Sequence, residues 1–269
     1  MASRGSFVCI FGYGSLMDIR SAQDTMPSAR NFRPAVLFNY QRVFSLVSIA
    51  GICNGNSRRD TLEMAALAIR PCAGACVKGV AFDIPGGEFE AYKEREHRYH
   101  AMQVMADELP LAVDGASKFT CWTVVEQTDD AYRAKMTGGD AEWQQRVGQH
   151  YNDGPLWGRN DILPLRGYLA DVVLAARSCG DASWLGNLLD GCLLADGVTT
   201  VREYLHAVGQ ERFPSAAAPD AIAVGVTCQS PDGLQNFLFS INSFASATER
   251  LSLQRANIYC WFRLTRVFF

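Results

Sequence analysis

The sequence has little net charge and no long hydrophobic run. Its 25 lysine and arginine residues nearly balance 28 acidic ones, which leaves a net charge of −3 over 269 residues. A charge this small does not create the field that attracts a polyanion. No run reaches the roughly 18 apolar residues that a membrane span needs, and Arg263 and Arg266 interrupt the apolar segment at 258–269. We therefore expect neither a nucleic-acid nor a membrane partner.

The sequence also lacks the cysteine spacing of a disulfide scaffold or a zinc site. Its nine cysteines are scattered, and the pair Cys72 and Cys76 is followed by no second pair with zinc spacing. The four histidines do not complete a site near that pair. We expect no metal and no cofactor. Reduced thiols, together with the lack of a secretory leader before the first apolar run, favour a cytoplasmic protein.

Apolar periodicity divides the chain into a strand-rich first half and a helical second half. The strands are expected at 7–13, 35–48, 62–70, 78–84 and 118–128, and the helices at 141–151, 163–180, 182–196 and 199–209. Strands followed by helices, without strict alternation, indicate the α+β class. Residues 1–214 are predicted to form one domain. Residues 215–269 contain few acids and follow no sustained period, so we expect a loosely packed or disordered tail.

A glycine-rich loop follows the first predicted strand. It has the sequence Phe11-Gly12-Tyr13-Gly14-Ser15-Leu16. Glycine allows close approach to the backbone, and successive N–H groups in such a turn can face one anion. The spacing fits neither the dinucleotide fingerprint nor the hydrolase nucleophile elbow. On its own, the loop is equally well explained as a tight turn without a ligand.

A carboxylate near residue 96 is the second candidate feature. Phe89, Tyr92, Glu96 and Tyr99 are spaced so that Glu96 lies on the apolar face of a short helix, just before a predicted strand that begins at His100. Burial and the negative end of the helix dipole would both raise the pKa of this carboxyl group, which suits a proton shuttle. The alternative is an ion pair with Arg95 or Arg98 at a solvated helix end.

Together the two features resemble the γ-glutamylcyclotransferase superfamily. The loop resembles the family's Tyr-Gly-Ser loop, and Arg95-Glu96 with Tyr99 resembles the "RE…Y" segment of its ChaC-like branch. The segments LPLRGYLADVVLAA and GVTTVREYL resemble the helical ending of bacterial and plant relatives, so the resemblance covers roughly residues 6–210. It implies a small mixed β-barrel with flanking helices and a helical C-terminal part. Leu16 is a departure from the branches that have asparagine there, and it leaves the substrate open.

The resemblance implies that the protein cleaves a γ-glutamyl amide and releases 5-oxoproline, with the substrate's own α-amine as nucleophile. Glu96 would transfer the protons, and the backbone of Gly12, Tyr13, Gly14, Ser15 and Leu16 would hold the carboxylate or the oxyanion. Tyr99 is expected beside the site, while core packing is the expected role of Tyr168 and Tyr204. The substrate would be glutathione, another γ-glutamyl peptide or a γ-glutamylamine.

Two alternatives remain open at this point. One is a non-catalytic module that binds a small molecule on the same fold. The other is a thiol-dependent hydrolase that uses Cys9, Cys53 or Cys121 with a histidine, although none of these cysteines has the sequence context of a nucleophile. The sequence does not indicate an oligomeric state.

Overall fold

The computed structural model describes residues 6–111, 117–180 and 182–212. The chain divides into two units, residues 1–200 and 201–269, and the second is described only in its helix α8. The strands of the first unit are β1 (Phe7–Gly12), β2 (Arg30–Val47), β3 (Glu63–Pro85), β4 (His100–Glu108), β5 (Lys118–Val125), β6 (Leu163–Pro164) and β7 (Cys192–Leu193). The α-helices of the chain are α1 (Ile19–Gln23), α2 (Ile49–Cys53), α3 (Phe89–Arg95), α4 (Asp129–Arg133), α5 (Gly139–Trp143), α6 (Arg166–Ser178), α7 (Ala182–Gly191) and α8 (Val201–Arg212).

Five strands close into a mixed β-barrel. They are hydrogen-bonded in the order β3-β1-β5-β4-β2, and β2 pairs with β3 to complete the ring. Only the contact between β1 and β5, through Ile10 and Trp122, is parallel within this ring. The short strands β6 and β7 extend the sheet beside β3 and β2. The predicted α+β class and mixed barrel with flanking helices are therefore confirmed.

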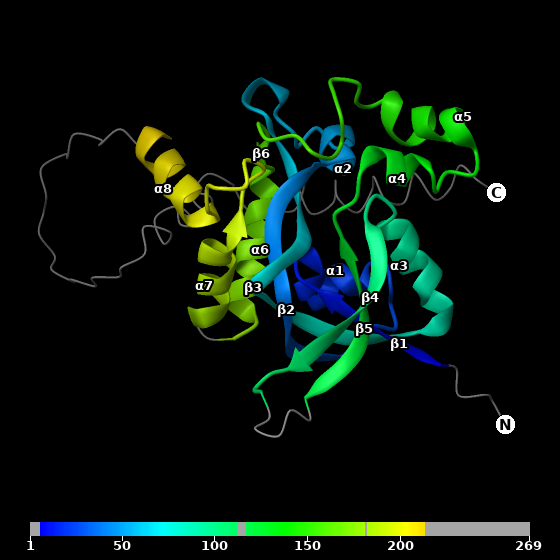
Figure 1. The fold of residues 1–269 in the computed structure, drawn as a ribbon, viewed down its shortest axis with the longest axis vertical. Helices are drawn as coiled ribbons and strands as arrows, with labels where there is room; N and C mark the ends of the chain where they lie inside the picture. Colours follow the sequence, from blue (N-terminus) through cyan, green and yellow to red (C-terminus); the bar gives the residue numbers. More distant parts are fainter. Residues whose placement is uncertain (1–5, 112–116, 181, 213–269) are drawn as a thin grey trace, which may run out of the picture. The chain divides into compact units, whose positions relative to one another are not determined.

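Strand β3 is one continuous element, whereas the sequence analysis predicts two strands separated by a turn. The interval at 71–76 contains Pro71 and Gly74, which are typical of turns. Its partner β2 changes register here, and Asn39 adopts a φ of 62°. The Asn39 side chain accepts a hydrogen bond of 3.1 Å from the Gly74 N–H. A bulge therefore absorbs the irregular residues, and the long β2–β3 ribbon continues past them (Figure 1).

Two predicted helices are shorter than expected. The first begins at Arg166 because Leu163 and Pro164 pair with β3, and proline disfavours helical backbone in the residue before it. The second ends at Gly191, after which Cys192 and Leu193 pair with β2. The helical segment expected at 141–151 consists of α5 and one π-helical turn, 144–148.

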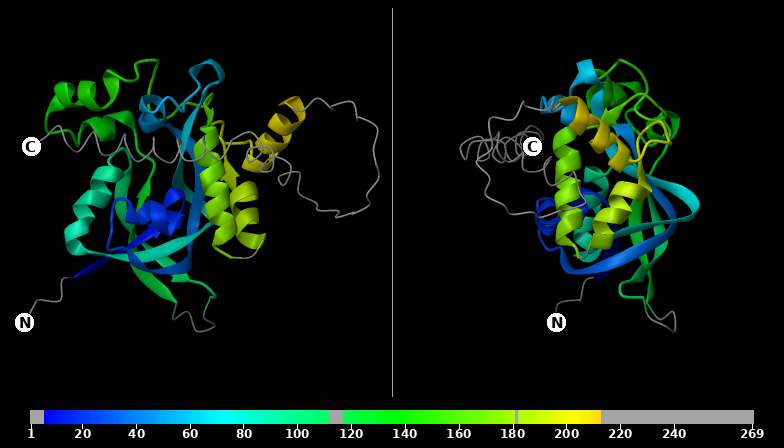
Figure 2. Two further views of the ribbon diagram at one scale, coloured as in Figure 1. Left: turned by 180° about the vertical axis from the view of Figure 1, so that it is seen from behind. Right: turned by 90° about the vertical axis from the view of Figure 1, so that its left-hand side faces the viewer.

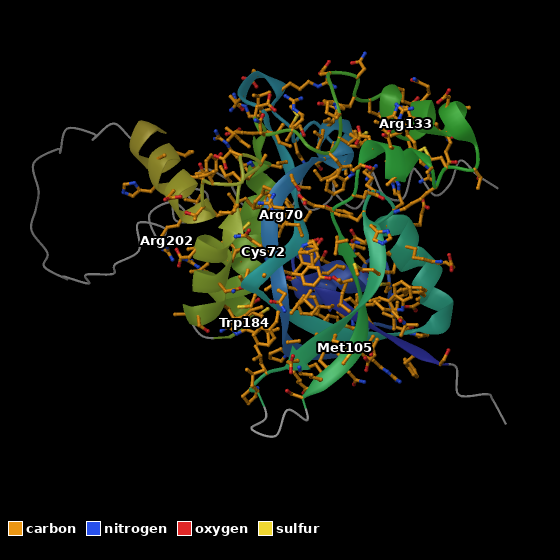
Figure 3. All side chains as sticks on the ribbon, viewed as in Figure 1. Arg70, Cys72, Met105, Arg133, Trp184 and Arg202 are labelled. Atoms are coloured by element: carbon orange, nitrogen blue, oxygen red, sulfur yellow. The ribbon has the colours of Figure 1, made fainter. Side chains whose placement is uncertain are left out.

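Helices α6 and α7 cover part of the β2–β3 ribbon, as both views of Figure 2 show. Trp184 on α7 is buried (Figure 3), as are Leu188 and Leu189 of the same helix. The helical ending predicted for the chain is present in α6, α7 and α8. The predicted boundary at residue 214 and the predicted tail lie outside the described residues.

Among the residues described, no helix is both long and apolar enough to cross a membrane. Large apolar side chains from several strands are buried in the core, including Ile10, Leu37, Phe44, Phe82 and Ile84, each at most 1 % exposed. This core fixes the end of β1, where the chain leaves the barrel and enters the glycine-rich loop.

Candidate active site

A cavity lies where the loop after β1 meets the end of α3. Its lining consists of Phe11, Gly12, Tyr13, Gly14, Ser15, Leu16, Leu67, Tyr92, Glu96, Tyr99, Val124 and Tyr168. The structure thus brings together every residue that the sequence analysis assigned to the site. Glu96 is the only charged side chain in this lining. The cavity combines one carboxylate, several hydroxyl groups and the backbone of the glycine-rich loop.

The loop requires glycine at two positions because its neighbours are very close. A Cβ atom on Gly12 would lie 2.7 Å from the Cβ of Leu16, and one on Gly14 would lie 2.7 Å from the hydroxyl of Tyr168. Beyond Gly14 the chain turns at once: the N–H of Met17 donates to the Gly14 carbonyl at 3.0 Å. The two glycines therefore serve close packing of the loop against itself and against α6.

A buried arginine fixes the orientation of the loop backbone. The Nε of Arg42, a residue only 2 % exposed, donates to the Tyr13 carbonyl at 3.0 Å, and its Nη1 donates to the Asn187 side chain of α7 at 2.8 Å. In a planar trans peptide the carbonyl and the next N–H point in opposite directions. The Gly14 N–H therefore points away from Arg42. Within the described part of the chain, the N–H groups of Gly14 and Leu16 have no hydrogen-bond partner.

Glu96 terminates α3 at the cavity. Its N–H donates to the Tyr92 carbonyl at 3.0 Å, which closes the last turn of the helix. Its side chain is 15 % exposed. Burial raises the pKa of Glu96 above its ordinary value, while the charges of Arg95 and Arg98 oppose that shift. A carboxyl group with a raised pKa can accept and return a proton near neutral pH.

Arg95 connects Glu96 to the glycine-rich loop. Its Nε donates to Glu96 Oε1 at 3.1 Å, and its Nη2 donates to Ser15 Oγ at 3.3 Å and to Ser21 Oγ at 2.9 Å. Thr25 accepts a further bond of 3.0 Å from Nη1. The ion pair considered in the sequence analysis is therefore present. It does not belong to a solvated helix end, since the Arg95 and Glu96 side chains are only 14 % and 15 % exposed.

Four tyrosines surround the carboxylate. The Tyr99 hydroxyl donates to the Leu67 carbonyl at 2.9 Å, and Tyr168 is hydrogen-bonded to the backbone of Ser15. Tyr13 and Tyr92 complete the group. Burial raises the pKa of all four hydroxyl groups, so each is a neutral hydrogen-bonding group at physiological pH.

The sequence analysis missed the place of Tyr92 and Tyr168 in this cavity. Tyr168 was expected in core packing, and it does pack its ring edge-on against Phe44 at 6.3 Å between centroids. Its hydroxyl nevertheless reaches the loop, and no local pattern distinguishes such a residue from an ordinary core tyrosine. The position of Tyr92 could have been predicted, because Tyr92 lies one helical turn before Glu96 on the same face of the helix.

Metal ligands and cysteine nucleophiles are the two other kinds of functional group considered for the site. Across the described ranges, no group of three or more histidine, cysteine or acidic residues could hold a metal ion. None of the cysteines considered as nucleophiles lines the cavity. Burial also raises the pKa of Cys9 to about 11 and that of Cys121 to about 12, so both are thiols at neutral pH.

Comparisons with known proteins extend to solved structures alone, since no protein-family model and no curated protein matches the sequence. Solved γ-glutamyl cyclotransferases match this chain in structure. One has a TM-score of 0.44 at 15 % identity over 76 % of this chain and 98 % of its own. A yeast γ-glutamyl cyclotransferase specific to glutathione has a TM-score of 0.40 at 16 % identity over 74 % and 99 %. A mouse AIG2-like protein has a TM-score of 0.30 at 16 % identity over 45 % and 77 %.

These matches are distant, and they assign no activity to this chain. They concern the arrangement of the backbone, whereas catalysis depends on the side chains and N–H groups of a site. The chemistry of the cavity is accordingly inferred from its own residues.

Proposed function

We propose that the protein is a γ-glutamylcyclotransferase, which converts a γ-glutamyl amide into 5-oxoproline and a free amine. The observation that carries the proposal is the cavity itself, where a buried carboxylate with a raised pKa faces a glycine-rich loop with unpartnered N–H groups. Intramolecular cyclisation requires only groups that bind and orient the glutamyl group and one group that transfers protons.

The glycine-rich loop is proposed to bind the glutamyl group. The N–H groups of Gly14 and Leu16 are suited to bind the α-carboxylate of the substrate or the oxyanion that forms on the γ-carbonyl oxygen. Hydroxyl groups of the surrounding tyrosines would complete the hydrogen bonds of the bound glutamyl group. Binding in this cavity would fold the glutamyl chain so that its α-nitrogen approaches its γ-carbon.

Glu96 provides the proton transfers. Its carboxylate accepts a proton from the substrate's α-ammonium group, and the free amine attacks the γ-carbon to give a cyclic tetrahedral intermediate. As the C–N bond to the leaving amine breaks, the protonated Glu96 donates a proton to that nitrogen and the carbonyl re-forms. Glu96 then takes the second proton from the ring nitrogen, which gives the neutral lactam, and passes it to the released amine, which departs as an ammonium ion. Glu96 ends the cycle as a carboxylate, so no net proton is gained or lost by the protein.

The proposal is tested by incubating the purified protein with a panel of γ-glutamyl peptides and γ-glutamylamines. We expect at least one compound to yield 5-oxoproline and its free amine in equal amounts, measured by chromatography. α-Glutamyl isomers of the same peptides are the matched controls, and they should yield neither product. Binding of panel members without 5-oxoproline would instead support the non-catalytic alternative.

A further inference from the structure

Arg42 is a buried cation whose hydrogen bonds in the described structure all go to neutral acceptors. Its guanidinium group donates to the Lys78 carbonyl as well as to the Tyr13 carbonyl and the Asn187 side chain. Its Nη2 also lies 3.9 Å from the Met17 sulfur. Among residues 6–111, 117–180 and 182–212, no carboxylate forms an ion pair with Arg42. A buried charge is normally paired, because it has lost its hydration.

The group nevertheless keeps its charge. Burial lowers the pKa of Arg42 to about 10, so the guanidinium group is still protonated at neutral pH. The side chains that act on this pKa after burial are thiols and phenols, those of Cys192, Tyr13, Cys76 and Tyr168. The structure therefore keeps a positive charge in its interior that no negative group of the described residues balances.

The charge of Arg42 reaches the cavity through one peptide group. The Tyr13 carbonyl that accepts from Arg42 Nε and the Gly14 N–H belong to the same peptide, and both residues line the cavity. A hydrogen bond from a cation draws electron density from the carbonyl oxygen, and this polarisation makes the N–H of the same peptide a stronger donor. Arg42 itself does not line the cavity. It can therefore act on a bound molecule only through the loop.

Asn187 of α7 holds the guanidinium group in this position. Its Oδ1 accepts from Arg42 Nη1 at 2.8 Å and from the Lys78 N–H at 2.9 Å. Its Nδ2 donates to the Cys76 carbonyl at 3.0 Å. The N–H and the carbonyl of β3 thus assign the amide oxygen of Asn187 to the side of Arg42. A carboxylate of nearly the same shape would bind Arg42 more strongly here, but it would also neutralise its charge.

We infer that Arg42 is a positioning residue whose charge balances an anionic group of the substrate at the glycine-rich loop. The charge acts through the Tyr13–Gly14 peptide, and Asn187 holds the guanidinium group without neutralising it. The α-carboxylate and the oxyanion both offer a negative oxygen to the Gly14 N–H, which has no partner in the described part of the chain. This inference rests on the proposed function and adds two residues outside the cavity to its machinery.

Substitution of Asn187 separates the charge of Arg42 from its position. Asn187→Asp retains the oxygen that accepts from Arg42 and adds a negative charge. Asn187→Leu is similar in size and removes the acceptor without adding charge, and both variants lose the donor to Cys76. We expect kcat/KM for a γ-glutamyl peptide to fall about 10- to 100-fold in Asn187→Asp and less in Asn187→Leu.

A purely structural role of Arg42 predicts the opposite order, because a carboxylate anchors a guanidinium group better than leucine does. An Asn187→Asp variant that is at least as active as Asn187→Leu would therefore overturn the inference. Asn54→Asp is the matched control. It adds the same charge at an exposed position outside the cavity lining, and it should leave kcat/KM unchanged. Thermal unfolding of each variant shows that the compared proteins are folded.

Substitution of Arg42 gives a second measurement of the same charge. Arg42→Lys keeps the charge and Arg42→Met removes it, while both lose part of the hydrogen-bond network. We expect kcat/KM to be about 10-fold or more higher in Arg42→Lys than in Arg42→Met. Equal values in the two folded variants would contradict a role for the charge. If Arg42→Met does not fold, the two Asn187 variants decide the question.

Failure of the proposed function gives a different result. A parent protein that releases no 5-oxoproline from any γ-glutamyl compound would contradict cyclotransferase activity. Calorimetric binding of 5-oxoproline and of its uncharged amide would then test the charge alone. Tighter binding of the acid that is lost in Asn187→Asp and kept in Asn54→Asp would support an anion site governed by Arg42. Equal affinities, or no binding of either compound, would overturn it.

Discussion

Replacement of Arg95 by methionine tests how the two halves of the site are connected. Methionine is similar in length and apolar, so it removes the charge and the hydrogen bonds while retaining much of the packing. The substitution breaks the bond of 3.1 Å to Glu96 and the bonds to Ser15 and Ser21. We expect it to lower activity and to raise the pKa of Glu96, because Arg95 holds that pKa down against the effect of burial.

The size of the effect follows from the burial of the pair. Arg95 and Glu96 are 14 % and 15 % exposed, so solvent screens their interaction only weakly. A hydrogen bond to a charged group contributes about 1.5–3 kcal/mol. The loss of that amount from the transition state lowers kcat/KM by roughly 10- to 100-fold. The protein should also be destabilised by about 1–3 kcal/mol, because the hydrogen bonds of Arg95 are lost. The loss is limited to this range because Glu96 can take up a proton once its charged partner is gone.

The assay is the pH dependence of 5-oxoproline release. Glu96 must be deprotonated to accept the substrate's proton, so activity rises with pH through its pKa. A higher pKa in Arg95→Met moves this rising limb to higher pH. Arg98 and the four cavity tyrosines also face Glu96, and the substitution leaves them unchanged.

Arg159→Met is the matched control for stability. Arg159 is also 14 % exposed and pairs with Asp161 at 2.6 Å, but it does not line the cavity. It should cost stability without moving the pH profile. A profile in Arg95→Met that coincides with that of the unsubstituted protein would refute an electrostatic role for Arg95 and leave only a structural one.

Four further substitutions test individual side chains. Burial raises the pKa of Glu96 in the folded protein, so the contribution of Glu96 to stability is present at low pH and is lost as pH rises through that pKa. In urea unfolding, the Glu96→Gln variant should have the same free energy of unfolding as the parent protein at low pH. At pH 8 its free energy of unfolding should be higher, by about 1.4 kcal/mol for each unit by which the pKa is raised. Tyr92→Phe removes a buried hydroxyl group that has no hydrogen-bond partner, and it should stabilise the protein by about 1 kcal/mol. Tyr132→Phe removes a hydrogen bond of 2.6 Å to His97 and should destabilise the protein. A destabilised Tyr92→Phe and a stabilised Tyr132→Phe would contradict these hydrogen-bond assignments. Gly14→Ala would place a methyl group 2.7 Å from the Tyr168 hydroxyl and should cost about 1–3 kcal/mol and most of the activity; normal activity would show that the loop does not need this close packing.

The parts of the site that the sequence could predict are local. The glycine-rich loop follows directly from its own residues, and the inward position of Glu96 follows from helical spacing within one short segment. The barrel strands are likewise indicated by their apolar runs, although the bulge that joins two of them into β3 depends on pairing with Asn39 across the ribbon.

The parts that it could not predict depend on contacts between distant segments. In the sequence, Arg42 is a single charged residue within an apolar strand. Its hydrogen bond to the Tyr13 carbonyl forms only because the barrel brings β2 beside the loop. Asn187 reaches the same arginine from more than a hundred residues away. Tyr168 lies against Gly14 because α6 packs there, and a single tyrosine in an amphipathic helix carries no sign of that role.

The most direct test of the account compares the protein with its Glu96→Gln variant on one γ-glutamyl peptide, with 5-oxoproline as the measured product. Glutamine preserves the shape of the side chain and its oxygen for Arg95, but it cannot exchange a proton. We expect the parent protein to release 5-oxoproline and the folded variant to release none above background. Equal rates from the two proteins would contradict the central claim that Glu96 transfers the protons of the cyclisation.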